Sequence, residues 1–286
     1  MGLRNIADVN DAYNDGRYRI YSFRKAPTQT TASGIWFDLS MSPGNPVPNY
    51  YAASPMVSKA LAQSTDGGIF HGANVSPATK HLHKLTAYTV TTTAVPLPVI
   101  LCDYLLYYPF IDMSVTDPQA MTVGDALPRY TTDKGLQMMA VEVAAQIGGV
   151  SFFVNYTNQD GVTGRTSATV TCNTQVTTGT IISTAPASVG CAGPFIPLQA
   201  GDTGVTAIES VTFLSGDVGL ITLVIVKPLA THQIYDITAP AEKDFLVNTQ
   251  SAPKIEDNAY LNLIAYPSGT LASSAIFGFI ETIFTE

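Results

Sequence analysis

The feature that most constrains the fold of this chain is a two-residue alternation of side chains that recurs along most of its 286 residues. In the segment RYRIYSF, Tyr18 and Ile20 fall on one face of an extended strand, and Arg17, Arg19 and Tyr21 fall on the other. Such segments are rich in Val, Ile, Thr, Tyr and Phe, which suit a pleated, half-buried surface. We expect strands at 17–23, 34–39, 82–92, 99–108, 136–145, 150–156, 166–172, 180–184, 207–214, 220–226, 260–265 and 275–284.

Turn-forming residues separate these segments. The run Asn158-Gln159-Asp160-Gly161 predicts a hairpin turn in which Gly161 supplies a positive φ. Ser215-Gly216-Asp217 predicts a second hairpin between two apolar runs. Proline-rich joints at 42–48, 96–98 and 194–197 are not expected inside central strands, because proline lacks the backbone N–H that a ladder needs.

Helix signals are scarce. Ser54 as N-cap with Pro55 at the first helical position predicts a helix from Pro55 to Gln63, and Leu3 to Tyr13 could form a short amphipathic helix. Lys134 to Ala145 is compatible with helix or strand; a strand is favoured because glycines open and close the run.

We therefore predict an all-β fold, an antiparallel β-sandwich of jelly-roll-like type, with an extended N-terminal arm and very little helix. Residues 1–60 would form the arm and linker with a short helix near its end, and residues 61–286 would form the sandwich, with a candidate inserted segment around 109–133.

Charge is unusually sparse. The chain has 14 Lys and Arg and 22 Asp and Glu, which is 13% of its residues, whereas a soluble domain usually carries about 25%. A surface so poor in charge suits a subunit covered by other chains, because interface cores are depleted in charge. The net charge of −8 and pI near 4.9 argue against direct binding of nucleic acid, which needs a basic footprint.

The few charges are unevenly placed. Arg17, Arg19, Arg24 and Lys25 form a basic stretch, whereas seven acids and two bases follow Leu229. One interpretation is that both charged ends are simply solvated. The other is that the basic arm docks on an acidic neighbouring copy. In this second interpretation the arm also anchors through aromatic side chains. These are Trp36, Tyr50 and Tyr51.

No membrane segment or secretory signal is expected. The N-terminus lacks an apolar stretch of the signal-peptide kind, and the longest apolar run, Val218 to Val226, is nine residues, about half of a helical span. Cys102, Cys172 and Cys191 are odd in number and widely spaced, which indicates reduced, buried thiols. A Cys172–Cys191 disulfide stays open as an alternative.

Three histidines are the candidate metal ligands. On a strand, His81 and His83 would share a face, and His71 could join them, yet no Asp, Glu or Cys between Asp66 and Cys102 completes the set. A role in a polar network is favoured over a metal site, and we expect no cofactor.

Catalysis finds no support in the sequence. There is no nucleophile elbow, P-loop or dinucleotide-binding glycine motif, so we expect a protein that is not an enzyme. Asp112, Asp117, Asp125 and Asp133 lie among prolines and a glycine and are expected to form turns. A cluster of aromatic residues could bind a sugar, but aromatic residues at strand spacing are expected to lie in the core or at an interface. The cluster consists of Tyr104, Tyr107, Tyr108 and Phe110.

Two segments and the Thr- and Gly-rich strands that follow them carry a resemblance. The segments are YSFRKAPTQTTASGIWFDLSMSPGNPVPNYYAASP, from Tyr21, and LCDYLLYYPFID, from Leu101. Together they resemble structural proteins of tailed-bacteriophage virions, in particular the auxiliary capsid proteins known as decoration or cement subunits. The resemblance lies in the overall character of the sequence over most of the chain and not in a single diagnostic motif.

This resemblance implies a non-enzymatic subunit that self-associates, most often as a trimer, and stabilises the head. Its partners would be further copies and the major capsid protein or other virion proteins. Its location would be the virion, assembled in the host cytoplasm. The alternatives are a neck or tail structural subunit and a carbohydrate-binding module of the tail-fibre type.

Overall fold

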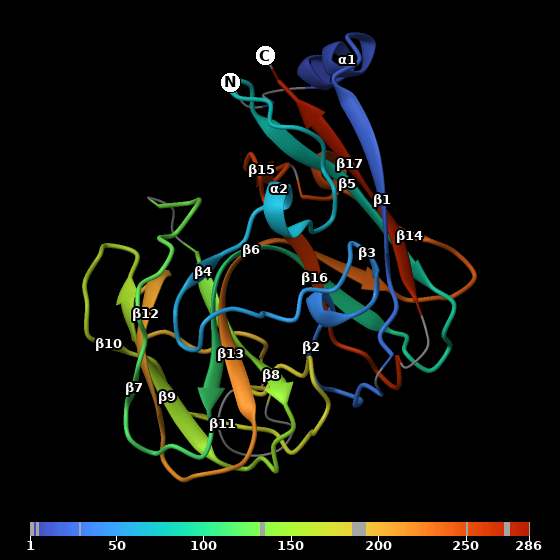
Figure 1. Cartoon of the computed structure of the whole chain (residues 1–286). Coiled ribbons are helices and arrows are strands. Elements are labelled where there is room, and N and C mark those ends of the chain that lie inside the picture. The colour runs from blue at the N-terminus through green and yellow to red at the C-terminus, as the bar shows by residue number, and fades with distance from the viewer. Residues whose placement is uncertain are drawn as a thin grey trace.

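Two long paired strands organise the molecule. The computed structural model describes residues 3, 6–28, 30–131, 135–184, 193–249, 251–271 and 275–285. Within it, β6 (Leu97–Asp112) and β13 (Leu220–Ile234) run antiparallel through the middle of the structure (Figure 1). Both strands are long. One half of each strand packs against a second sheet, and the other half packs against a third sheet.

Three antiparallel sheets make up the fold. The central sheet contains β2 (Phe37–Asp38), β16 (Leu261–Ala265), β6, β13 and β8 (Gln137–Ala144), with β4 (Lys59–Ala60) beside β6. The terminal sheet contains β14 (Ala241–Asp244), β5 (Lys80–Thr89), β17 (Ile276–Phe284), β1 (Tyr18–Lys25) and β3 (Gly44–Asn45), with β15 (Lys254–Ile255) beside β5. The distal sheet contains β10 (Arg165–Thr166), β9 (Ser151–Asn158), β12 (Val205–Phe213) and β7 (Gln119–Ala120), with β11 (Val170–Thr171) beside β9.

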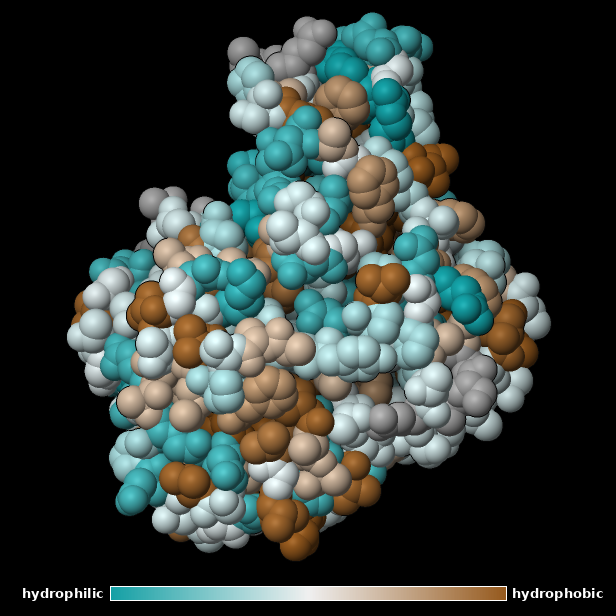
Figure 2. Space-filling model, viewed as in Figure 1, coloured by the Kyte–Doolittle hydropathy of each residue, from teal (hydrophilic) through white to brown (hydrophobic). Residues whose placement is uncertain are grey.

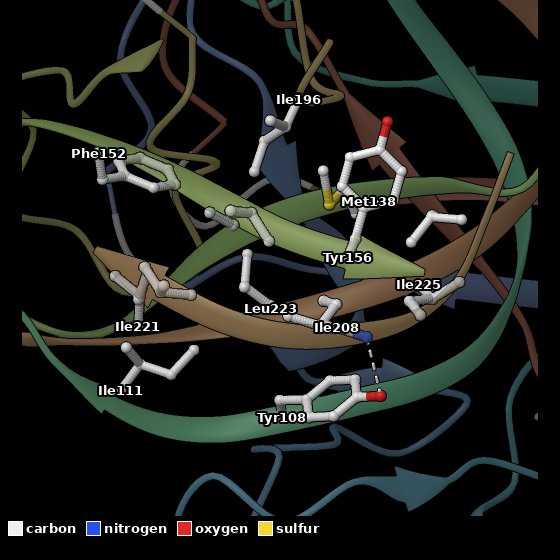
Figure 3. Packing of buried hydrophobic residues seen from close by; sticks show 14 of the residues in the cluster. Tyr108, Ile111, Met138, Phe152, Tyr156, Ile196, Ile208, Ile221, Leu223 and Ile225 are labelled. Carbon is white, nitrogen blue, oxygen red and sulfur yellow. Dashed lines mark hydrogen bonds between the residues drawn. The ribbon is translucent and has the colours of Figure 1, made fainter. Parts of the chain in front are cut away.

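Two hydrophobic clusters join the central sheet to the other two sheets. The first cluster packs Leu223 and Ile225 of β13 against Phe152 and Tyr156 of β9, and the Tyr108 hydroxyl accepts a hydrogen bond from the Ile208 backbone N–H at 3.2 Å (Figure 3). The second cluster combines the first half of β6 with side chains of β1, β5 and β17. The predicted all-β antiparallel sandwich is confirmed, and it is built from three sheets rather than from the two of a simple jelly roll.

A third cluster covers the opposite face of the central sheet. Here Tyr104 and Val224 of the sheet pack against Tyr51, Leu61 and other residues of the irregular segment 36–61. The prolines do keep much of this segment out of regular structure, but the segment packs on the central sheet of its own subunit. The prediction that residues 1–60 form an arm outside the sandwich is therefore wrong.

Strand β1 gives the second reason for this correction. It pairs over its whole length with β17, from Tyr18 opposite Ile283 to Lys25 opposite Ile276. Phe23 is buried in the cluster between the terminal and central sheets. Residues from the two ends of the chain are thus neighbours in one sheet, and both termini lie at the same end of the molecule (Figure 1).

The two central strands contain prolines and irregularities in their register. The register between β6 and β13 skips Pro109 and Phe110 at one point, and Phe110 adopts a positive φ of 56°. A second irregularity follows Pro228. The first bulge leaves Pro109 out of the ladder, so its missing N–H interrupts no regular pairing. Pro228 and Pro98 stay in register opposite Cys102 and Gln233, so the expectation that the 96–98 joint lies outside a central strand is wrong.

Most predicted strands are present, including the ambiguous segment that forms β8, and the 158–161 turn joins β9 to β10 as expected. Two local predictions are wrong. The 215–217 turn makes no hairpin, because β12 and β13 belong to different sheets. The segment from Pro55 forms no helix up to Gln63: Met56 has φ of 57° and Lys59–Ala60 pair with β6.

Helices are few and short among the residues that the structure describes. They are α1 (Ile6–Asn14), α2 (Gln63–Asp66), α3 (Phe245–Asn248) and the 3₁₀ turn η1 (Leu39–Met41). Helix α1, which was expected from the sequence, packs Val9 and Ala12 on Ile283 of β17. Within the described part of the chain, no helix has the length and apolar character needed to cross a membrane.

The cysteines that can be placed are buried. Cys102 and Cys172 are free thiols, and burial raises the pKa of Cys172 to about 12. Cys191 lies outside the residues that the structure describes, and so does the alternative of its pairing with Cys172.

Candidate functional site

The residues predicted to form an interaction surface fall into an exposed and a buried group. Arg19 and Arg24 are exposed on β1, and the guanidinium of Arg24 lies 5.5 Å from the centre of the Phe277 ring. Lys25 is fully buried, and its ammonium donates hydrogen bonds to the carbonyls of Ser42 and Pro46 at 2.9 and 3.0 Å. Lys25 cannot contact a partner from this position, so its assignment to the interaction surface is wrong.

The aromatic candidates divide in the same way. Tyr50 is 57% exposed, whereas Tyr51 is completely buried and its hydroxyl donates a hydrogen bond to the Asp38 carboxylate. Tyr51 therefore fixes the 36–61 segment on the central sheet and is not available to a neighbour. Trp36 is half-buried, with its ring 5.1 Å from that of Tyr266.

Of the four aromatic residues on β6 that were expected to be core or interface, three lie in the core and Phe110 is only partly buried. Tyr104, Tyr107 and Tyr108 are each less than 5% exposed. Of the acidic residues predicted to form turns, Asp112 accepts a hydrogen bond from the Ser114 N–H at 2.8 Å, and Asp125 pairs with Lys59 at 2.9 Å. Asp133 lies outside the described residues.

The three candidate histidines have separate partners. His81 contacts the Ala252 carbonyl at 3.2 Å, and His83 lies 3.2 Å from the Tyr13 hydroxyl and 3.5 Å from Asp244. His71 is enclosed beside Ala259. In the described part of the chain, no group of three or more His, Cys, Asp or Glu side chains is placed to hold a metal ion.

Two of the predicted basic residues and one histidine meet at a pocket of about 520 Å³, which we call the basic pocket. It lies between β1, β17 and the loop that leads into β5. Its lining includes Arg17, Arg19, His71 and Lys80 and contains no Asp or Glu among the described residues. Arg17 pairs with Asp15 at 2.8 Å, outside this lining.

Lys80 is the charged group deepest in this pocket. It is 2% exposed, and its ammonium donates to the Ala73 carbonyl at 2.8 Å and to Nδ1 of His71 at 3.1 Å. Burial lowers the pKa of His71 to about 4, and the nearby Lys80 charge adds to this effect. His71 is therefore neutral at pH 7, with Nε2–H donating to the Ala259 carbonyl at 2.9 Å and Nδ1 accepting from Lys80.

A second feature is an exposed apolar surface at the far end of the molecule, which we call the end patch. It is formed by side chains that are between 37% and 69% exposed. They are Val115, Ile147, Val176, Leu214 and Val218. Figure 2 shows brown, hydrophobic side chains gathering at the lower end, opposite the termini.

Hydrogen bonds hold the loops of the end patch together. The Asp217 carboxylate accepts from the backbone N–H groups of Gly148 at 2.6 Å and Val218 at 2.7 Å, and the Asp217 N–H donates to the Met113 carbonyl at 2.9 Å. Gln146 donates to the Gln175 carbonyl at 3.2 Å. The apolar side chains thus project from loops that are fixed to one another, which favours a preformed contact surface.

Comparisons with known proteins assign no family. No protein-family model and no curated protein matches this chain. Among solved structures, the infectious bursal disease virus VP2 subviral particle aligns over 93% of this chain and 80% of that chain, with 9% sequence identity and a TM-score of 0.14. A likeness at that level carries no argument about fold or function.

Proposed function

We propose that this chain is a non-enzymatic structural subunit of a bacteriophage particle, a decoration or cement protein that self-associates and stabilises the head. The observation that carries the proposal is the end patch, five exposed apolar side chains on mutually fixed loops. Large apolar side chains exposed on neighbouring loops favour an interaction site over the surface of a solitary monomer.

The sparse charge of the whole chain supports the same proposal. Charged residues make up 13% of the sequence, and large apolar side chains remain exposed on several elements besides the end patch. Few charges would have to be desolvated when such a surface is covered, so association incurs a small electrostatic penalty. The partners in this proposal are further copies, most often in a trimer, and the major capsid protein.

The proposal is tested on particles produced with and without this protein. Particles lacking a cement subunit assemble but lose DNA at a lower temperature, because each bound subunit stabilises the closed shell and an array adds avidity. The measurement is DNA release against temperature, followed by dye fluorescence. Adding purified protein back restores the heat resistance.

Imaging the same particles by electron microscopy separates head from neck and tail positions. Identical heat resistance with and without the protein, together with density at the neck or tail, would replace the cement role with a neck or tail role. Absence of the protein from purified particles would remove the proposal altogether.

A further inference from the structure

The basic pocket concentrates positive charge in a chain that is acidic overall. Three of the 14 basic residues, Arg17, Arg19 and Lys80, line it, although acids outnumber bases by 22 to 14 along the sequence. Pairing of β1 with β17 and of β17 with β5 brings these cations together, because it sets Arg19 opposite Thr282 and Lys80 opposite Phe284. The pocket is therefore a product of the fold, since its cations are distant in sequence.

The Lys80 ammonium is held in place by acceptors that carry no formal charge. Neutral His71 and the Ala73 carbonyl accept hydrogen bonds from two of its three N–H groups. Within the described residues, no third acceptor lies at hydrogen-bond distance. The Asp257 charge influences Lys80, but the Asp257 carboxylate accepts hydrogen bonds from the Val75 and Ser76 N–H groups at 2.9 and 3.1 Å.

Arg19 supplies the second cation at the mouth of the pocket. Its guanidinium contacts the carbonyls of Gly16 and Tyr18 and lies 5.9 Å from the centre of the Phe284 ring. No ion pair of Arg19 occurs within the described residues. A guanidinium held against a ring keeps N–H donors for a planar or tetrahedral oxyanion.

Uncharged donors complete the lining. Tyr21 and Thr282 bring hydroxyl groups, and Asn74 brings an amide, to the same pocket. A buried ammonium without a carboxylate partner is costly unless an anion shares its site. We propose that the basic pocket binds a small oxyanion, a phosphate or carboxylate group, through Lys80 and Arg19 with Arg17 beside them. This inference does not depend on the proposed virion role.

Two sources could supply this oxyanion: a free ion, or an acidic side chain of a second copy. For the free ion, inorganic phosphate is titrated into the full chain at constant ionic strength, with sodium chloride as the reference. We expect a saturable rise in melting temperature, as for any ligand that binds only the folded state. Arg19→Gln should weaken phosphate binding about tenfold or more, because a charge-assisted hydrogen bond is lost.

Arg24→Gln is the matched control. It removes the same charge from the same strand, at an exposed position outside the pocket lining, and should leave phosphate binding unchanged. Lys80→Met tests the deeper cation, and its far-ultraviolet circular dichroism reports whether the variant folds. Because Arg19 is exposed, Arg19→Gln keeps the test valid even if Lys80→Met unfolds.

The second source is tested by self-association of the same variants. If phosphate does not bind, yet Arg19→Gln loses self-association that Arg24→Gln retains, the oxyanion is a carboxylate of another copy. The proposal is overturned if phosphate acts no differently from chloride and both variants associate like the wild type. Equal loss of phosphate binding in both variants would also overturn it.

Discussion

At the residue scale, Glu142 is the side chain most at odds with its surroundings. It lies on β8 and is fully buried beside the core between the central and distal sheets. Burial raises the pKa of its carboxyl to about 8, the neighbouring Gln146 opposes the rise, and the Asp217 charge adds to it. The folded protein therefore holds a proton here at neutral pH that the unfolded chain releases.

This proton makes stability depend on pH in a defined direction. A carboxyl whose pKa is higher in the folded state destabilises the fold progressively as pH rises from about 4.5 to about 8. Glu142→Gln keeps the shape and removes the ionisation. We expect no gain in the free energy of unfolding near pH 4 and a gain of up to about 4 kcal/mol near pH 8. Urea denaturation at the two pH values measures it.

Glu242→Gln is the control for this experiment, because Glu242 is exposed and pairs with Lys84 at the surface. It should change the free energy of unfolding by less than about 1 kcal/mol at either pH. A Glu142→Gln variant with the pH profile of the wild type would show that the carboxyl does not titrate in this range.

A second prediction at this scale concerns the buried pair Asp103–Arg129. Arg129 donates from Nε and Nη2 to the two carboxylate oxygens at 2.9 and 2.6 Å, and Nη1 donates to the Leu61 carbonyl at 2.9 Å. Arg129→Met leaves the Asp103 charge buried without its partner and should lower the free energy of unfolding by about 3–5 kcal/mol. Chemical denaturation measures the loss.

The double variant Asp103→Asn with Arg129→Met separates charge from packing. It removes both charges, so it should be more stable than Arg129→Met alone. If both variants were equally unstable, the loss would come from the missing hydrogen bonds to Leu61 and Tyr104 and not from an isolated carboxylate.

At the element scale, the sequence predicted strands well because alternation is local. Segment 99–108 reads as a strand from its own residues and lies within β6. The 215–217 turn was wrongly predicted to be a hairpin because both runs that flank it are apolar. Two apolar strands can either pair within one sheet or pack against each other from two sheets, and the sequence does not distinguish these arrangements. Val211 of β12 and Ile221 of β13 in fact both lie in the core between two sheets.

The candidate sites were only partly predictable for a related reason. Arg17 and Arg19 stood out as a basic stretch, but nothing local links them to Lys80, which reaches them through two strand pairings with β17. His71 was noticed as a possible ligand, whereas its role as a neutral acceptor for Lys80 depends on burial. The end patch could not be predicted, because the sequence does not distinguish an exposed apolar residue from one that is buried in the core.

Strand β1 carries the prediction for this scale. Deleting residues 1–16 removes α1 and its contacts on Ile283 but leaves the strand, so we expect a folded protein less stable by about 3 kcal/mol. Deleting residues 1–50 removes β1, β2 and β3 together with the buried Phe23 and Leu39, so we expect an unfolded chain. Circular dichroism and limited proteolysis compare the two. A cooperative transition after the longer deletion would restore the arm hypothesis.

At the scale of the whole molecule, the two candidate surfaces lie far apart. The termini, β1 and β17 mark one end, and the loops that follow β8 and β12 mark the other (Figure 1). One end presents positive charge in a pocket and the other presents apolar side chains. A subunit with unlike ends can use one for its own copies and the other for a different contact, which suits a component of a larger assembly.

The last prediction concerns how the subunits associate. If the end patch is the contact between copies, the oligomer should be nearly insensitive to salt, because added ions screen charges and leave apolar contact intact. Sedimentation velocity at about 0.05 M and about 1 M sodium chloride should give the same oligomer, with a trimer expected. Val176→Asp should dissociate the oligomer, because it places a charge in the contact. Val90→Asp is the control and should leave the oligomer intact, because Val90 lies outside the end patch. The two valines are similarly exposed, at 59% for Val176 and 63% for Val90. A stable monomer of 30.4 kDa at micromolar concentration would contradict self-association, and an oligomer that dissociates with salt but tolerates Val176→Asp would point to the charged end instead.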